Sequence, residues 1–188
     1  MAAERIKAIV DCRGAVAILG IDRDILGIVA RAQAVERQLV GRCPGVRLVK
    51  RDGSFNTPHE QQVAEEALRA NPDLAAVIAL TGNSTSGALS AVKNLHLERP
   101  IRVIGFDPDS MGFADPSLDS LVLEDTRAMG GEGVRRILSR IAGGSWPRAT
   151  EVEPVLVTRA NAESPRILQL TSMSWSPEPL RPSWGLIP

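Results

Sequence analysis

Short, continuously apolar segments alternate along this chain with longer segments whose apolar residues recur at helical spacing. The apolar segments have the length and the branched side chains of strands buried on both faces of a sheet. They are residues 15–20, 46–50, 75–80, 101–106 and 119–123. Strands that alternate with helices predict parallel β-α-β units with right-handed crossovers. We therefore expect an α/β fold, a three-layer parallel sheet with helices on both faces.

The helix signals between these strands support the same order of elements. Thr57 can cap a helix, Pro58 suits its first turn, and Glu60 completes a capping box. A further helix is predicted from Thr126 to about Ile141, where two glycines close it.

The ends of the chain differ from its middle. Residues 1–13 are expected to be a leader or linker, and residues 14–161 a single α/β domain. A sixth strand is predicted at 152–157, and Pro154 favours an edge position for it. The last 25 residues contain five prolines and two tryptophans, so we expect 162–188 to be an irregular tail.

Composition narrows the class of protein. The 22 basic and 22 acidic residues give a formal net charge of zero, which argues against nucleic-acid contact. No apolar run is long enough for a membrane span, and the N-terminus has no secretory signal, so no membrane insertion is expected. Cys12 and Cys43 fit no metal-ligand spacing. A disulfide between them is possible, but two free thiols are the favoured interpretation.

Motifs that would indicate an enzyme are absent. Gly82 and Gly87 have the spacing of a phosphate loop, but Ala88 and Leu89 stand where lysine and serine or threonine are needed. The first strand exit lacks the glycine-rich dinucleotide turn, and no nucleophile elbow occurs. The sequence therefore predicts neither a catalytic site nor a metal site nor a cofactor.

Polar side chains instead follow the strands, at the sheet edge where open α/β sheets bind ligands. The candidate ligand-binding residues are Asp22, Thr81, Asn83, Asp107 and Glu124. Carboxylates accept hydrogen bonds from vicinal hydroxyls, and amide and hydroxyl groups supply donors. This set of groups suits a sugar, a polyol or a similar small polar ligand.

Each candidate also has a structural explanation. Asp22 and Asp107 can cap the turn or helix that follows them. Thr81 and Asn83 can be ordinary turn residues, and Glu124 can be an exposed neighbour of a cap. Asp107 is the residue for which ligand contact is favoured, because it directly follows the strand at 101–106.

The order and the amino-acid sequences of these segments resemble those of the type 1 periplasmic binding protein family. The similarity spans residues 14–161 and rests most on NPDLAAVIAL followed by GAL, and on VIGFD. Ribose-binding-like proteins and the effector domains of lactose-repressor-like regulators share this fold. The resemblance implies a carbohydrate held between two lobes that close about a hinge.

By this resemblance, Asp107 matches the family's sugar-binding aspartate and Glu124 a hinge-proximal position where a polar residue meets the ligand. Thr81 stands where the family often has a binding asparagine, which Asn83 can replace from the same loop. The family's arginine on the first helix aligns with Val29, and Arg31 matches a neighbouring arginine.

The resemblance covers only the second lobe and a helix at about 126–142 that in the family returns to the first lobe. The apolar residues of that helix then need another partner. They are Met129, Val134, Ile137, Leu138 and Ile141. We expect self-association, contact with a missing first lobe, or folding of the helix onto this lobe. Because one lobe supplies half a cleft, we also expect weak ligand binding.

Three functions follow from the sequence. The first is the solute-binding component of an ABC-type sugar uptake system, which places the protein in the periplasm. The second is the effector-binding domain of a lactose-repressor-like transcriptional regulator in the cytoplasm. The third is a truncated interaction module without a ligand.

Overall fold

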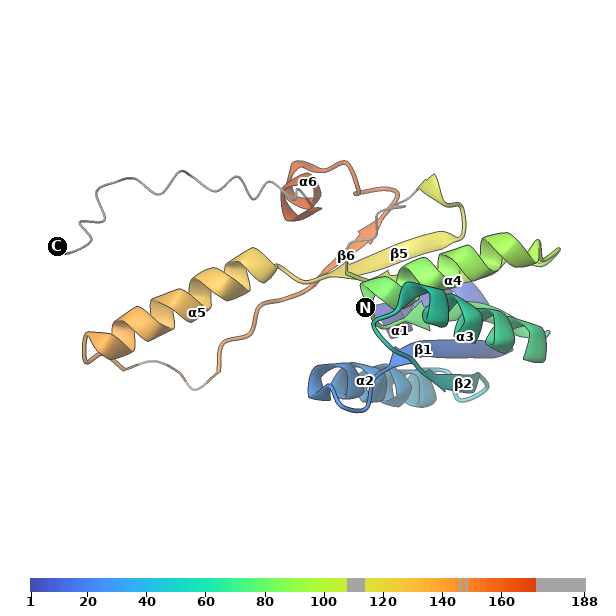
Figure 1. Cartoon of the computed structure of the whole chain (residues 1–188), viewed down its shortest axis with the longest axis horizontal. Coiled ribbons are helices and arrows are strands. Elements are labelled where there is room, and N and C mark those ends of the chain that lie inside the picture. Colours follow the sequence, from blue (N-terminus) through green and yellow to red (C-terminus); the bar gives the residue numbers. More distant parts are fainter. Residues whose placement is uncertain (108–113, 146, 148, 172–188) are drawn as a thin grey trace.

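A computed structural model describes residues 1–107, 114–145, 147 and 149–171 of the chain (Figure 1). Six strands and six helices occur in these residues. In chain order they are α1 (Ala2–Val10), β1 (Ala15–Ile21), α2 (Leu26–Arg42), β2 (Arg47–Asp52), α3 (Thr57–Ala70), β3 (Leu74–Ala79), α4 (Gly82–Leu95), β4 (Arg102–Phe106), β5 (Leu118–Leu123), α5 (Thr126–Ile141), β6 (Val155–Thr158) and α6 (Pro165–Thr171).

The strands form one sheet in the order β2-β1-β3-β4-β5-β6. The first five are parallel, which confirms the predicted α/β class. β6 was expected to be parallel but pairs antiparallel with β5. The chain leaves the carboxyl end of β5 through α5 and returns from that side, so β6 runs back along its neighbour. As Pro154 indicated, β6 is an edge strand.

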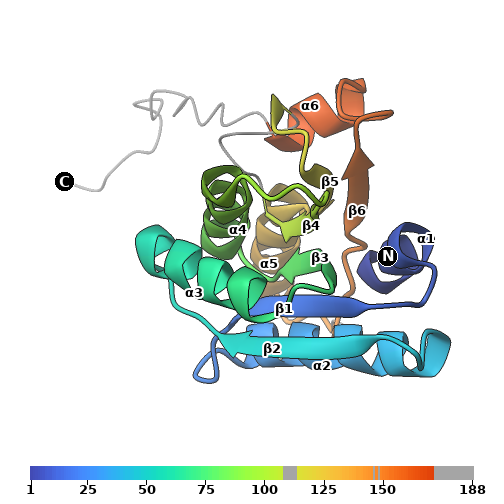
Figure 2. The same cartoon turned by 90° about the vertical axis from the view of Figure 1, so that its right-hand side faces the viewer.

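Helices cover both faces of the sheet. α3 and α4 pack on one face through residues such as Leu68 and Leu89, and α1 and α2 on the other through Ile6 and Leu39 (Figure 2). The chain moves from β1 outward to β2 and then across to β3, so the crossover direction reverses between β1 and β3. Such a switch point opens a crevice at the carboxyl ends of the two strands.

The segment 1–13 is not the leader or linker expected from the sequence. It contains α1, whose Ala2, Ile6 and Val10 are buried against the sheet. Arg5 on the same helix donates two hydrogen bonds, of 2.6 and 2.8 Å, to the carboxylate of Asp119. Burial alone raises the pKa of Asp119, but the hydrogen bonds and charge of Arg5, together with smaller contributions such as the charge of Arg102, shift it downward overall. This charged pair fastens α1 to β5.

The predicted cap of α3 is wrong by one residue. Asn56, not Thr57, is the N-cap, and its side chain accepts a hydrogen bond from the backbone N–H of His59. Pro58 lies in the first turn as predicted. Glu60 is buried rather than part of a capping box, because α3 packs closely on α4. The backbone of α3 comes so near Gly87 of α4 that any side chain there would collide with it.

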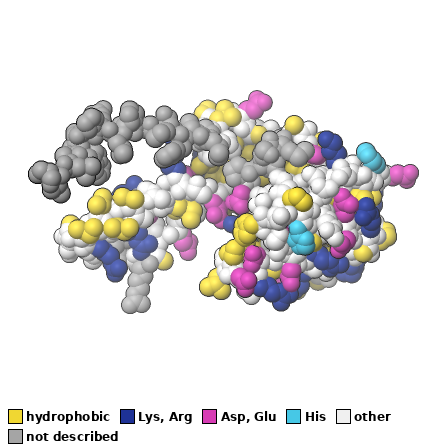
Figure 3. All heavy atoms as spheres, in the orientation of Figure 1, with side chains coloured by type: hydrophobic (Ala, Val, Ile, Leu, Met, Phe, Trp, Pro, Cys, Tyr) yellow, Lys and Arg dark blue, Asp and Glu magenta, His cyan; other side chains and the backbone are white. Residues whose placement is uncertain are grey.

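α5 has the bounds predicted from the sequence, but it extends away from the rest of the fold (Figure 1). None of its residues is buried. A row of hydrophobic side chains lies open along it (Figure 3). The helix therefore does not fold back onto this lobe, and self-association or contact with a missing first lobe stays a prediction for its apolar face.

Cys12 and Cys43 form a disulfide, contrary to the expectation of two free thiols. Cys12 follows α1, and Cys43 ends α2 on the same face of the sheet. The spacing of 31 residues gave no hint of this proximity. Part of the expected irregular tail is helical, since α6 covers Pro165–Thr171, and the remainder lies outside the described residues. Within the described part of the chain, no helix is both long and apolar enough to span a bilayer.

Candidate ligand site

The carboxyl ends of the parallel strands bring together Arg31, Asp107 and Glu124, and Asp22 lies at the same edge of the sheet. Asp22 follows β1, Asp107 follows β4, and Glu124 follows β5. Arg31 comes from the second turn of α2 and reaches the same edge. The site thus lies beside the switch point between β1 and β3, which is the place where this topology binds ligands.

Arg31 is the centre of this cluster. Its guanidinium donates to the carbonyl oxygen of Leu80 at 2.5 Å and to the carboxylate of Glu124 at 2.6 Å. The same group lies 4.4 Å from the centroid of the Phe106 ring, a cation–π contact. Arg31 is 20% exposed and Glu124 39% exposed, so both can also meet a ligand at the edge. The guanidinium fork is held in place from three sides.

Asp107 ends β4 at the same place. Its backbone adopts φ 65°, a left-handed conformation that aspartate tolerates better than most residues. The backbone N–H of Gly82, at the start of α4, donates to its carboxylate. Burial raises the pKa of Asp107 and the charge of Glu124 adds to this, while Arg31 and the Gly82 N–H oppose it. The half-buried carboxylate therefore accepts a proton more readily than an exposed aspartate.

Asp22 lies at the carboxyl end of β1. One of its carboxylate oxygens accepts a hydrogen bond of 2.9 Å from the backbone N–H of Asp24, which is the turn role considered from the sequence. Nearby, the exposed Arg23 pairs with Asp52 at the end of β2. Asp22 remains partly exposed at this edge although its side chain accepts the hydrogen bond of the turn.

Thr81 and Asn83 have structural roles in this fold. The Thr81 hydroxyl accepts from the Ser84 backbone N–H and caps α4, and only 5% of the residue is exposed. The Asn83 amide nitrogen donates to the backbone oxygen of Phe55 and to the hydroxyl of Thr57. These two residues therefore position the loops around the site, whereas Asp107, Arg31 and Glu124 lie together.

Glu60 is a buried carboxylate beneath the same edge. It is 1% exposed, and one of its oxygens accepts from the backbone N–H of Ser54. The other oxygen is buried without a hydrogen-bond partner among the described residues. Burial raises its pKa, and the charge of Asp22 adds to the rise. Gly53 leaves the space for this carboxylate, since a Cβ there would lie 2.4 Å from it.

The sequence alone did not identify Arg31 or Glu60 as parts of this region. Arg31 follows Ile28 by three residues and precedes Val35 by four. It therefore continues the buried stripe of α2. This spacing is the feature of the sequence that places Arg31 on the inward face of the helix. Val29, which the family resemblance aligned with a binding arginine, lines a separate hollow beside β2 instead.

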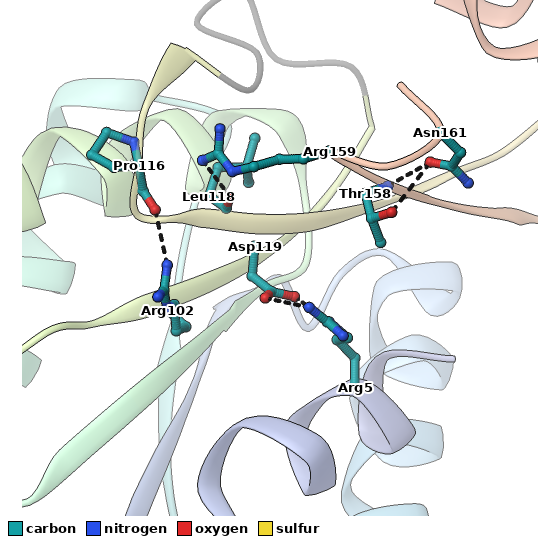
Figure 4. A network of polar contacts seen from close by, with 8 residues as sticks. All are labelled: Arg5, Arg102, Pro116, Leu118, Asp119, Thr158, Arg159 and Asn161. Atoms are coloured by element: carbon teal, nitrogen blue, oxygen red, sulfur yellow. Dashed lines mark hydrogen bonds and ion pairs between the residues drawn. The ribbon is translucent and has the colours of Figure 1, made fainter. Parts of the chain in front are cut away.

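A second polar cluster lies at the opposite, amino edge of the sheet (Figure 4). Arg5 pairs with Asp119, and Arg102 and Arg159 donate to backbone carbonyls around the start of β5. A shallow hollow of about 520 Å³ lies among them. These contacts join α1, β4, β5 and the end of β6, which gives the cluster a structural role.

A cavity of about 910 Å³ also lies at the amino edge, lined by the end of α4 and the start of β4. Leu97, Arg99 and Ile101 are among its lining residues. The Arg99 guanidinium donates to backbone carbonyls at the end of α3 and at the start of β3, so its charge is engaged within the fold. In the part of the chain that the structure describes, no group of three His, Cys, Asp or Glu side chains could hold a metal ion.

The carboxyl-edge cluster presents one half-buried acceptor and one fixed cationic donor. Asp107 can accept hydrogen bonds from two adjacent hydroxyls, and the fork of Arg31 can donate to ring or hydroxyl oxygens. Phe106 is buried, and its ring supports the Arg31 guanidinium that faces the edge. The arrangement can bind a hydroxylated small molecule in a defined orientation.

Comparison with solved structures places this fold among sugar-binding proteins. An ABC transporter solute-binding protein from Agrobacterium vitis, bound with alpha-D-tagatopyranose, superposes with a TM-score of 0.82 at 16% identity. That match covers 90% of this chain and 58% of the other. A carbohydrate transporter solute-binding protein from Agrobacterium radiobacter, in complex with D-arabinose, gives 0.81 at 25% identity, covering 90% and 59%.

A glucose-galactose-binding protein from Geobacillus stearothermophilus gives a TM-score of 0.80 at 20% identity, with 86% of this chain and 59% of that chain covered. This chain thus spans less than two thirds of the length of these proteins and matches one lobe of their fold. No curated protein matches it significantly in sequence.

A family model described as a periplasmic binding protein-like domain matches residues 15–161. These residues contain all six strands and the whole candidate site. The match extends over most of the chain and agrees with the superposed structures. The chain therefore belongs to the periplasmic binding protein-like domain family.

Proposed function

We propose that this chain binds a neutral carbohydrate or a related polyol at the carboxyl edge of its sheet. The observation that carries the proposal is the cluster of Asp107, Arg31 and Glu124 beside Phe106. A charged acceptor and a charged donor, each already hydrogen-bonded, are ordered before a ligand arrives. Groups ordered in this way lose little conformational entropy on binding.

We further propose that the chain acts as a solute-binding component of an ABC-type sugar uptake system and does not transform its ligand. The superposed proteins are described as solute-binding proteins of sugar transporters, several with a sugar bound. The Cys12–Cys43 disulfide favours an oxidising compartment such as the periplasm over the cytoplasm, where a transcriptional regulator would work.

All residues of the cluster come from this one lobe, and Arg31 and Glu124 remain partly exposed there. Ligand sites normally bury most of the ligand surface, so a single lobe provides only part of the usual contact. We therefore expect weak binding with clear dependence on hydroxyl stereochemistry.

A thermal-shift screen tests the proposal. D-Tagatose, D-arabinose, D-allose, D-fucose, D-glucose and D-galactose are suitable probes, because the superposed proteins are described with these sugars. At least one sugar should raise the melting temperature of the wild type and leave Asp107→Asn unaffected. Asp73→Asn is the matched control, since Asp73 is a paired aspartate at the amino edge.

The control should respond to sugar as the wild type does. A sugar response that survives in Asp107→Asn would show that the ligand binds elsewhere. The absence of any response in the wild type would favour the interaction module without a ligand.

A further inference from the structure

The open face of α5 carries an apolar stripe. Val134, Ile137, Leu138 and Ile141 recur at helical spacing on one side of the helix and are 57%, 61%, 60% and 77% exposed. Nothing in the described part of the chain packs on them. A contiguous apolar surface of this kind marks an interaction site.

Arginines flank this stripe. Arg135 and Arg140 fall on either side of it by helical geometry, and Arg127 and Arg136 lie on the same helix. Glu132 is the single acid of α5 and pairs with Arg135 at 2.9 Å. The helix thus presents an apolar strip within a strongly positive field.

The carboxyl edge of the sheet has the opposite character. Ile25, Leu26 and Phe55 are exposed there at 38%, 83% and 56%. Acids outnumber bases around them. The acids are Asp22, Asp24, Asp52, Asp107, Glu124 and Asp125, and the bases are Arg23, Arg31 and Arg51. Acidic side chains are visible on the side of the lobe turned toward α5 (Figure 3).

We propose that α5 of one chain packs over the carboxyl edge of a second copy, and that the second copy does the same in return. The apolar stripe would cover Ile25, Leu26 and Phe55, while the arginines meet the acids around them. A contact that each of two identical chains makes with the other in the same way gives a closed two-fold dimer.

Charge selects this arrangement over direct packing of two α5 helices. Two copies of α5 side by side would bring eight arginines and only two glutamates together, and like charges at an interface oppose association. In the dimer that we propose, each basic helix meets an acidic surface. In this dimer, each α5 would also cover the Asp107 cluster of the second copy. The dimer does not depend on the proposed sugar binding.

Sedimentation velocity of the full chain at increasing concentration tests the association. The wild type should pass from monomer to dimer, and Ile141→Glu should lose the dimer because it places a charge in the apolar stripe. Ser139→Glu is the matched control, since it adds the same charge on the other side of the helix, and it should keep the dimer. Circular dichroism confirms that each variant is folded.

A charge exchange tests which surfaces meet. One variant carries Arg135→Glu and Arg140→Glu on α5, and the other carries Asp24→Lys and Asp52→Lys on the sheet edge. Each variant alone should lose the dimer, because its helix and edge then have the same sign of charge. An equimolar mixture should recover it, since every contact in the mixed dimer pairs opposite charges.

Several results would overturn the proposal. If the wild type stays monomeric at every concentration, the apolar stripe of α5 binds a partner of different sequence and not a second copy. A dimer that survives in the variant with the altered sheet edge points to contact between two α5 helices. A mixture that stays monomeric, although both variants are folded, shows that the edge and the helix do not meet.

Discussion

Replacing Arg31 by Met should weaken the fold as well as the site. Methionine keeps the apolar stem of the side chain but removes the guanidinium. The change therefore leaves most of the packing of α2 intact. It deletes the contacts that join α2 to the ends of β3, β4 and β5.

The structure gives the size of the loss. The hydrogen bond to Leu80 reaches the carbonyl of a fully buried residue, and an unsatisfied buried acceptor costs about 1–3 kcal/mol. The contact with Phe106 at 4.4 Å contributes about 0.5–1 kcal/mol. The ion pair with Glu124 is partly exposed and contributes about 1 kcal/mol at most. We expect a total loss of about 2–4 kcal/mol.

Urea unfolding followed by circular dichroism at neutral pH measures this difference. Arg23→Met is the matched control, because Arg23 forms an ion pair of 3.0 Å with Asp52 at the same edge but both side chains are mostly exposed. The control should leave the free energy of unfolding unchanged. If Arg31→Met were as stable as Arg23→Met, the central place given to Arg31 in this site would be refuted.

Three further predictions concern titratable groups and the disulfide. Burial raises the pKa of Glu60 above its ordinary 4.5, so its contribution to stability is complete below that pH and is lost as the pH rises through the folded-state pKa. In urea titrations, the free energy of unfolding of Glu60→Gln should therefore rise relative to that of the wild type between acid and neutral pH. A difference in this free energy that stays constant with pH would contradict the expectation. Reduction of the Cys12–Cys43 disulfide, which closes a loop of 31 residues, should lower the free energy of unfolding by about 3–4 kcal/mol. A Cys12→Ser/Cys43→Ser variant that unfolds like the oxidised wild type would oppose that expectation. Sugar affinity should fall as the pH drops through the raised pKa of Asp107, because the ionised carboxylate accepts hydrogen bonds from two hydroxyls with both of its oxygens. Calorimetry of the wild type measures this, and an affinity that stays constant from neutral to acid pH would oppose the expectation.

Much of the fold follows from local sequence patterns. The five parallel strands are fully or partly apolar, and turns and caps separate them from the helices, so their places could be predicted within one or two residues. The bounds of α5 agree as well, because Asp125 and Thr126 at its start and the glycines after it are strong local signals.

Features that depend on the path of the chain in space could not be predicted in this way. β6 runs antiparallel because α5 leads the chain out at the carboxyl edge, which no pattern within 152–157 encodes. The same limit explains the disulfide, since its two cysteines meet only after α1 and α2 pack side by side. The helix α1 was missed although its buried residues, Ala2, Ala3, Ile6 and Val10, recur at helical spacing.

The candidate site shows the same division. The place of Asp107 after an apolar strand was sufficient to predict its position at the ligand edge. Arg31 and Glu60 lie inside helices, and their roles arise from how α2 and α3 pack against the sheet. Local patterns predict which residues end strands, but not which long side chains reach those ends from a neighbouring helix.

An NMR titration of the ¹⁵N-labelled chain with the most stabilising sugar tests the central claim most directly. The backbone amides of Gly82 and Asp107 and the side-chain signals of Arg31 should shift together, because they surround one ligand. Shifts confined to residues of the amino-edge cavity, such as Leu97 and Ile101, would contradict the account and move the binding site to the other end of the sheet.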